Sequence, residues 1–140
     1  MPVTYSILPQ RNLAVFTYSG EVKLCEPAAV VAAATAHPSY CDGMRQLCDV
    51  SRVTAVEHDA PALLKLHAHL ADSLLARPHE LVVVFYAPTQ VGQEMAEMAR
   101  RSWDGVSSVI VLVMVDEAEA LAVLGLPETS LEALMACSAQ

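Results

Sequence analysis

The chain has 140 residues, 54% of them hydrophobic and 17% charged, and its 16 acidic against 8 basic side chains give a formal charge of −8. This size and composition predict one globular domain, residues 1–140, with a substantial core, and exclude global disorder. The acidic balance argues against nucleic acid and anionic membranes as partners.

The apolar runs at 81–87 and 109–115 are far shorter than the about 20 residues that cross a bilayer, so no membrane span is expected. The opening Met-Pro-Val-Thr-Tyr has neither the basic lead nor the apolar segment of a secretory signal, which predicts a cytoplasmic protein. The four cysteines are widely spaced and form no C-x-x-C pattern. We therefore expect free thiols, with Cys48 buried inside a strand.

The first half of the chain predicts a hairpin, a helix and a third strand. Two alternating segments flank a turn at 9–12, and Gly20 is expected to end the hairpin. A helical stripe begins at Leu24, and the helix is expected to stop at His37-Pro38. The predicted strands of this half are residues 3–8, 13–19 and 45–50.

The second half alternates helices with strands that are apolar on both faces, as strands covered by helices on each side should be. The predicted strands are 81–86 and 108–115, and the predicted helices are 59 to about 76, 90–103, 116–125 and 130 to about 137. The residues expected to cap three of these helices are Asp59, Asp116 and Thr129.

This pattern predicts an α/β fold, either two-layered or a sandwich, with helices packed on a five-stranded mixed sheet. We write the predicted order of elements as ββαβαβαα. The alternation in the second half implies mostly parallel strands, and the opening hairpin adds an antiparallel pair.

The joint between the third strand and the following helix organises this arrangement. The strand is expected to end at Val50, and a long polar loop is expected to lead into the helix that starts near Asp59. We predict that this loop is the partner-binding surface, formed by Ser51, Arg52, Val56, Glu57, His58 and Asp59.

Three patterns in the chain are His37-Pro38-x-Tyr40-x-x-Gly43, Leu47-x-Asp49-x-Ser51-x-Val53 and Glu119-Ala120-Leu121-Ala122-x-Leu124-Gly125. Together with the order of elements, they resemble bacterial SpoIIAA-like proteins, which are often labelled STAS-like and compared with CRAL-TRIO lipid-transfer domains. The likeness extends over nearly the whole chain. It implies a small cytoplasmic α/β protein similar to anti-sigma-factor antagonists, which bind a partner kinase.

In those antagonists, phosphorylation of a serine at the start of the second helix switches binding. Their Asp-Ser-Ser-Gly run corresponds by spacing to Glu57-His58-Asp59-Ala60, which contains no hydroxyl. The resemblance therefore implies the interaction architecture without the serine switch. Asp59 is explained as a helix cap, and the alternative is that it imitates a permanent charge.

Polar side chains also gather at the expected carboxyl ends of the parallel strands, where ligands of open α/β sheets bind. These residues are Asp49, Ser51, Arg52, Tyr86, Thr89 and Asp116. The acidic members disfavour an anion there, and caps and turn formers explain the set. We find no catalytic, dinucleotide-binding or metal-binding motif, and we expect no cofactor, no metal and no enzymatic activity.

A second candidate site is an apolar pocket formed by His67, Tyr86, Met95, Met98 and Trp103. His67 falls in the centre of the apolar stripe of its helix, whereas His69 falls on the solvated side with Lys65 and Asp72. His67 is either a core histidine bonded to a carbonyl or hydroxyl, or a residue that lines a cavity. The small residues Gly92, Ala96 and Ala99 would permit the close approach of a neighbouring helix.

The sequence therefore predicts a non-enzymatic cytoplasmic interaction or regulatory module that binds an unknown protein partner. The alternative is a carrier or sensor of a small apolar ligand held between helices. Whether the chain forms a homodimer stays open at this point.

Overall fold

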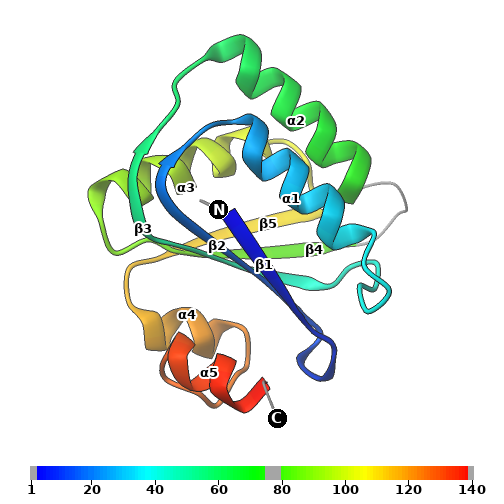
Figure 1. The fold of residues 1–140 in the computed structure, drawn as a ribbon, viewed down its shortest axis with the longest axis vertical. Helices are drawn as coiled ribbons and strands as arrows, with labels where there is room; N and C mark the ends of the chain where they lie inside the picture. Colours follow the sequence, from blue (N-terminus) through cyan, green and yellow to red (C-terminus); the bar gives the residue numbers. More distant parts are fainter. Residues whose placement is uncertain (1–2, 75–79, 139–140) are drawn as a thin grey trace.

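The computed structural model describes residues 3–74 and 80–138 (Figure 1). The five strands are β1 (Val3–Leu8), β2 (Leu13–Val22), β3 (Arg45–Val56), β4 (Leu81–Tyr86) and β5 (Val109–Met114). The helices are η1 (Pro9–Arg11), α1 (Cys25–Thr35), α2 (Ala60–Leu74), α3 (Gln90–Ser102), α4 (Glu117–Val123) and α5 (Leu131–Ser138). The predicted end of the second helix, near Ala76 and before Pro78, lies outside the described residues.

The strands form one sheet in the order β1-β2-β3-β4-β5. β1 is antiparallel to β2, and the remaining neighbours are parallel. This confirms the predicted five-stranded mixed sheet and the α/β class. Apart from the single 3-10 turn η1, the observed order is ββαβαβαβαα, which contains one strand–helix pair more than the predicted string.

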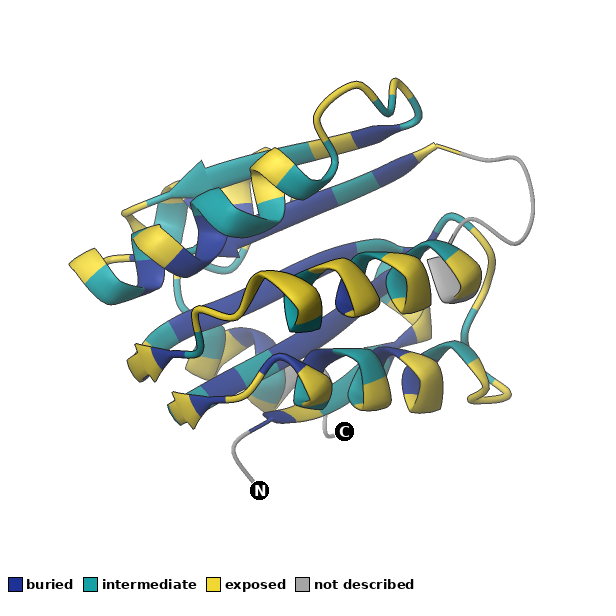
Figure 2. Cartoon of the chain, turned by 90° about the horizontal axis from the view of Figure 1, so that it is seen from above, coloured by how far each residue is buried: buried dark blue, intermediate teal, exposed yellow. Residues whose placement is uncertain are grey.

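Helices cover both faces of the sheet, so the predicted sandwich is the correct arrangement. α1, α2 and α3 lie on one face, and the two short helices α4 and α5 lie on the other (Figure 1). Alternate residues of each strand supply the two cores. Phe16, Cys48 and Phe85 belong to the core on the first side, and Leu13, Leu47, Val84 and Leu134 belong to the core on the second. Figure 2 shows the exposed residues of the helices facing outward from these layers.

The central strands are longer than the sequence predicted. β2 continues past Gly20 to Val22, and β3 continues past Val50 to Val56. The predicted stop at Gly20 is wrong because this glycine, at φ +68°, accommodates an irregular register within the β2–β3 pair. The polar residues Ser51, Arg52 and Thr54 therefore belong to a strand, since β2 supplies the pairing partner that a local pattern does not reveal.

Side-chain caps hold most helix starts as predicted. The Asp59 carboxylate accepts a hydrogen bond from the Ala62 N–H at 3.2 Å, and Asp116 accepts from the Glu119 N–H at 3.0 Å. The cap of α5 is Ser130, whose hydroxyl accepts from the Ala133 N–H at 3.1 Å, and not Thr129 as predicted.

Gly92 brings α3 directly onto β3. A Cβ atom at this position would lie 2.9 Å from the Val50 carbonyl oxygen and 3.1 Å from Thr89 Oγ1. The small residue thus permits contact with a strand backbone, whereas the sequence predicted that it would face another helix. This contact sets the height of α3 above the sheet.

Candidate functional site

The carboxyl ends of β2 and β3 form a two-stranded extension beyond the rest of the sheet. β3 pairs with β4 only as far as Asp49, which lies opposite Tyr86, and its pairing with β2 continues to Val56, opposite Val22. In Figure 1 this extension curves away from the sheet toward the starts of α1 and α2. We call the segment of β3 from Arg52 to Val56, with the following residues to Asp59, the β3–α2 joint.

Three of the six residues predicted to bind a partner make hydrogen bonds that order this joint or the part of β3 just before it. The Glu57 carboxylate accepts a hydrogen bond from the Leu24 N–H at 3.2 Å, which ties the start of α2 to the start of α1. Ser51 donates its hydroxyl to Asp49 at 2.6 Å and its N–H to the same oxygen at 2.9 Å. Asp59 caps α2, so its carboxylate has a structural role.

The prediction that Val56 contacts a partner is wrong. This residue is only 8% exposed and belongs to the core beneath the joint. The irregular register of the β2–β3 pair, with shifts between Asp49 and Arg52 and between Val53 and Ala55, interrupts the strand alternation here. Val53 and Val56 are therefore both buried, whereas Arg52 and Thr54 are exposed. A charge at Val56 would therefore disrupt the core before it could test partner binding.

Arg52 and His58 are the two predicted residues that remain available. Both are exposed, and neither side chain makes a hydrogen bond or ion pair with a described residue. The joint therefore presents an arginine and a histidine side chain to solvent. Its backbone is held in place by the buried Val53 and Val56 and by the hydrogen bond between Glu57 and Leu24.

The polar residues at the carboxyl ends of β4 and β5 serve mainly as helix caps. Thr89 Oγ1 accepts from the Gly92 N–H at 3.0 Å, and Asp116 caps α4. The pKa of Tyr86 is raised by partial burial and, secondarily, by the charges of Glu117, Asp49 and Asp116. The three acids thus act on the phenol of Tyr86. Among the described residues, no group of three His, Cys, Asp or Glu side chains could hold a metal ion.

An apolar cavity of about 80 Å³ lies between α2, α3 and the sheet. Four of the five residues predicted for the pocket line it, namely His67, Met95, Met98 and Trp103. The fifth predicted residue, Tyr86, does not line the cavity. Its neighbour Phe85 faces the cavity, because successive residues of a strand point to opposite faces and Tyr86 packs against the core on the α4 side.

His67 contributes the most unusual group of this cavity. Its Nε2 atom is buried and has no hydrogen-bond partner, and desolvation lowers the pKa of the imidazole. His67 therefore lines the cavity, and no carbonyl or hydroxyl of the described residues bonds its Nε2 atom.

The sequence did not reveal three further features of the cavity wall. Tyr18 from β2, and Leu24 and Pro27 near the start of α1, complete the lining. They lie far from α2 in the sequence. The packing of α1 beside α2 brings Leu24 and Pro27 to the cavity, and the place of β2 in the sheet brings Tyr18 there. Val56 also lines the cavity, which places the cavity directly under the β3–α2 joint.

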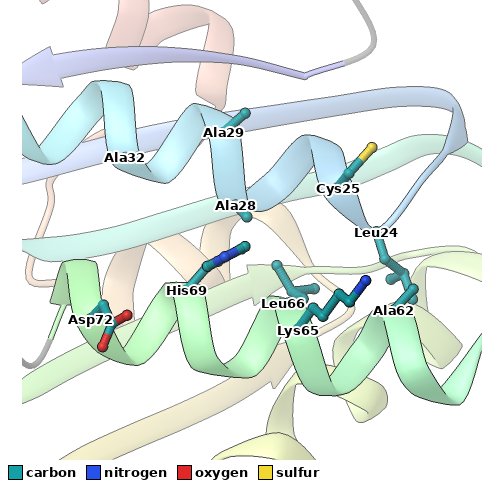
Figure 3. A pocket seen from close by; sticks show the side chains of 10 residues that line it. All are labelled: Leu24, Cys25, Ala28, Ala29, Ala32, Ala62, Lys65, Leu66, His69 and Asp72. Carbon is teal, nitrogen blue, oxygen red and sulfur yellow. The ribbon is translucent and has the colours of Figure 1, made fainter.

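A separate open groove of about 460 Å³ runs between α1 and α2 (Figure 3). Its α1 side carries Ala28, Ala29 and Ala32, and its α2 side carries Lys65, His69 and Asp72, as drawn in Figure 3. The prediction that His69 lies on the exposed side of α2 is confirmed. The groove is a shallow surface feature, because the alanines leave the space between the helices unfilled.

No protein-family model matches the chain, and no curated protein matches it. Among solved structures, the chain is similar to the anti-sigma factor antagonist SpoIIAA in its unphosphorylated form. The identity is 12%, the alignment covers 86% of this chain and 94% of that chain, and the TM-score is 0.49. Within the described residues, no helix is long and apolar enough to span a membrane.

Proposed function

We propose that the protein is a non-enzymatic module of the cytoplasm that acts by binding a partner protein through the β3–α2 joint. Arg52, Thr54 and His58 form the contact surface. The observation that carries this proposal is the extension of β3 beyond its neighbour β4, which exposes these side chains on an ordered backbone.

The joint suits recognition because its backbone is held in place before a partner arrives. Val53 and Val56 anchor it in the core, and Glu57 links it to Leu24. A surface that is already ordered loses little conformational entropy on binding. Arginine is among the residues that most often dominate the energy of protein interfaces.

The backbone of the joint offers a second means of recognition. Beyond Asp49, β3 has no strand neighbour on its β4 side among the described residues. An extended segment of a partner can pair with such an edge through main-chain hydrogen bonds, while pockets and exposed side chains select its sequence. Arg52 and Thr54 flank this edge on the outward face.

We further propose that phosphorylation at the start of α2 does not control this binding. This proposal is supported by the spacing, which makes Glu57-His58-Asp59-Ala60 correspond to the run that carries the serine in the antagonists. The four residues here offer no hydroxyl. The Asp59 carboxylate here caps α2 through the Ala62 N–H, so a fixed negative group already occupies the helix start.

The experiment is site-specific photo-crosslinking in the native host. A photoreactive amino acid replaces Thr54 in the joint or, as a control, Ala133, which is exposed on α5 on the other side of the sheet. We expect a discrete adduct from position 54 that is absent from position 133. An adduct of twice the chain mass would identify a second copy as the partner.

Arg52→Ala and His58→Ala should each reduce the yield of this adduct several-fold while leaving the circular dichroism spectrum unchanged. The matched controls are Arg101→Ala and His69→Ala, which remove the same side chains from exposed sites on α3 and α2. If all four variants crosslink equally, or if position 133 gives the same adduct, the joint is not the interface.

The alternative function, carriage of an apolar molecule between helices, has a specific structural basis in the cavity beneath α2. Its volume of about 80 Å³ is well below the roughly 300–1,000 Å³ of pockets that enclose drug-sized ligands. A lipid-sized cargo would require α2 to move away from the core. The cavity therefore favours a much smaller molecule.

A further inference from the structure

The cavity beneath α2 contains one polar atom that the fold leaves unsatisfied. His67 Nε2 is buried without a hydrogen-bond partner. Leaving such a group unpaired disfavours folding, and buried polar atoms in proteins are almost always bonded to protein, water or ligand. Because His67 also lines the cavity, the space beside it can hold the missing partner.

The rest of the cavity wall selects strongly against charge. Its lining comes from β2–β4, from α2 and α3, and from the region around the start of α1, and none of the lining residues is acidic, lysine or arginine. The one hydroxyl that α3 contributes, Ser102 Oγ, donates to the Met98 carbonyl at 2.6 Å. A charged ligand would lose its hydration there without gaining an opposite charge.

We propose that this cavity binds a small, uncharged, mostly apolar molecule with a single hydroxyl group, which hydrogen-bonds to His67 Nε2. A hydroxyl both donates and accepts, so it satisfies this nitrogen in either tautomer of the neutral imidazole. The apolar part of the molecule contacts Met95, Met98 and Trp103.

The cavity size limits the ligand further. An apolar cavity of about 150 Å³ is known to hold benzene, and the cavity here is about 80 Å³. The ligand therefore has fewer heavy atoms than benzene. Met95 and Met98 permit some adjustment because methionine side chains are unbranched and flexible.

The competing explanation is an ordered water on Nε2. A polar cavity can trap water when it offers several hydrogen-bond partners. Here the described wall offers one unsatisfied nitrogen and the hydroxyls of Tyr18 and Ser102, of which Ser102 already donates to Met98, while the remaining lining is apolar. A hydroxyl carried on an apolar body fits this combination better than water, because it also covers the apolar surface.

The test uses 1-butanol as the probe and 1-chlorobutane as a control of similar shape that lacks the hydroxyl. Binding to the full chain is followed by NMR of methionine methyl groups and of 15N-labelled histidine. We expect 1-butanol to shift the methyl signals of Met95 and Met98 and the Nε2 signal of His67. The control should bind more weakly and leave Nε2 unchanged.

His67→Leu should weaken 1-butanol binding by about two- to tenfold, the effect of one net hydrogen bond, without weakening the binding of 1-chlorobutane. The matched control is His69→Leu, the same change on the exposed side of α2, which should alter neither. If His67→Leu does not fold, the Nε2 signal in the unmodified chain still decides the question. Equal affinity for both probes, an unshifted Nε2 signal, or shifts confined to the groove between α1 and α2 would each overturn the proposal.

Discussion

Replacing Gly92 by alanine tests the contact that sets α3 on the sheet. The added Cβ atom would lie 2.9 Å from the Val50 carbonyl oxygen and 3.1 Å from both Val50 Cγ2 and Thr89 Oγ1. The first of these is a backbone atom in the middle of β3, so it cannot rotate away. Either α3 or β3 has to shift to make room.

Three effects determine the size of the change. Alanine in place of a helical glycine stabilises by up to about 1 kcal/mol. Overpacking of a tight contact costs about 1–3 kcal/mol, and weakening of the Thr89 cap costs up to about 1 kcal/mol. We expect a net destabilisation of about 1–2 kcal/mol, which corresponds to a decrease in Tm of roughly 3–6 °C for a chain of this size.

Urea denaturation of Gly92→Ala, Thr89→Ala and the double variant separates these effects. If Cβ acts partly through the cap, Gly92→Ala should cost less in the Thr89→Ala background than in the native one. A Gly92→Ala protein as stable as the native chain, or more stable, would show that helix propensity dominates and that α3 does not pack tightly against Val50.

Two further predictions concern the core on the α4 side and the buried thiol. Leu134 is a residue of α5 and is completely buried, so Leu134→Ala should lower the free energy of unfolding by about 2–5 kcal/mol. The exposed control Ala133→Ser should change it little, and a small effect at Leu134 in urea denaturation would contradict the docking of α5 on the sheet. Burial raises the pKa of Cys48 to about 12, so iodoacetamide at pH 8 should label the exposed Cys25 and Cys41 before Cys48, as peptide mass spectrometry would show. The unfolded thiol ionises near its ordinary pKa, so this group also lowers stability as the pH rises above about 9. Rapid labelling of Cys48 in the folded chain would contradict its burial.

Local features of the sequence predicted the elements and most of their ends correctly. Asp59 and Asp116 cap their helices as expected, because a cap depends on residues within one turn of the chain. The error at Thr129 is a shift of a single residue, since Ser130 offers the same hydroxyl chemistry.

The candidate sites were predicted less completely, because they depend on residues that are distant in the sequence. The sequence predicted a loop from Ser51 onward where the structure continues β3 to Val56, and it took Val56 as a contact residue although this residue is part of the core. Periodicity placed His67 on the buried side of α2, yet it did not show whether a bonding partner would meet the imidazole. The pocket was assigned Tyr86 instead of Phe85, since both faces of β4 are apolar and its alternation carries no signal.

The sequence by itself determined the number of strands, the α/β class and the sequence positions of the helices. These properties follow from hydrophobic periodicity, turn residues and caps, all of which act between near neighbours. Only the tertiary structure decided that the segment 51–56, with its polar residues Ser51, Arg52 and Thr54, extends β3, because β2 provides its pairing. It also decided that α2 covers a cavity with an unpaired His67 Nε2, because side chains from distant elements meet there without filling the space.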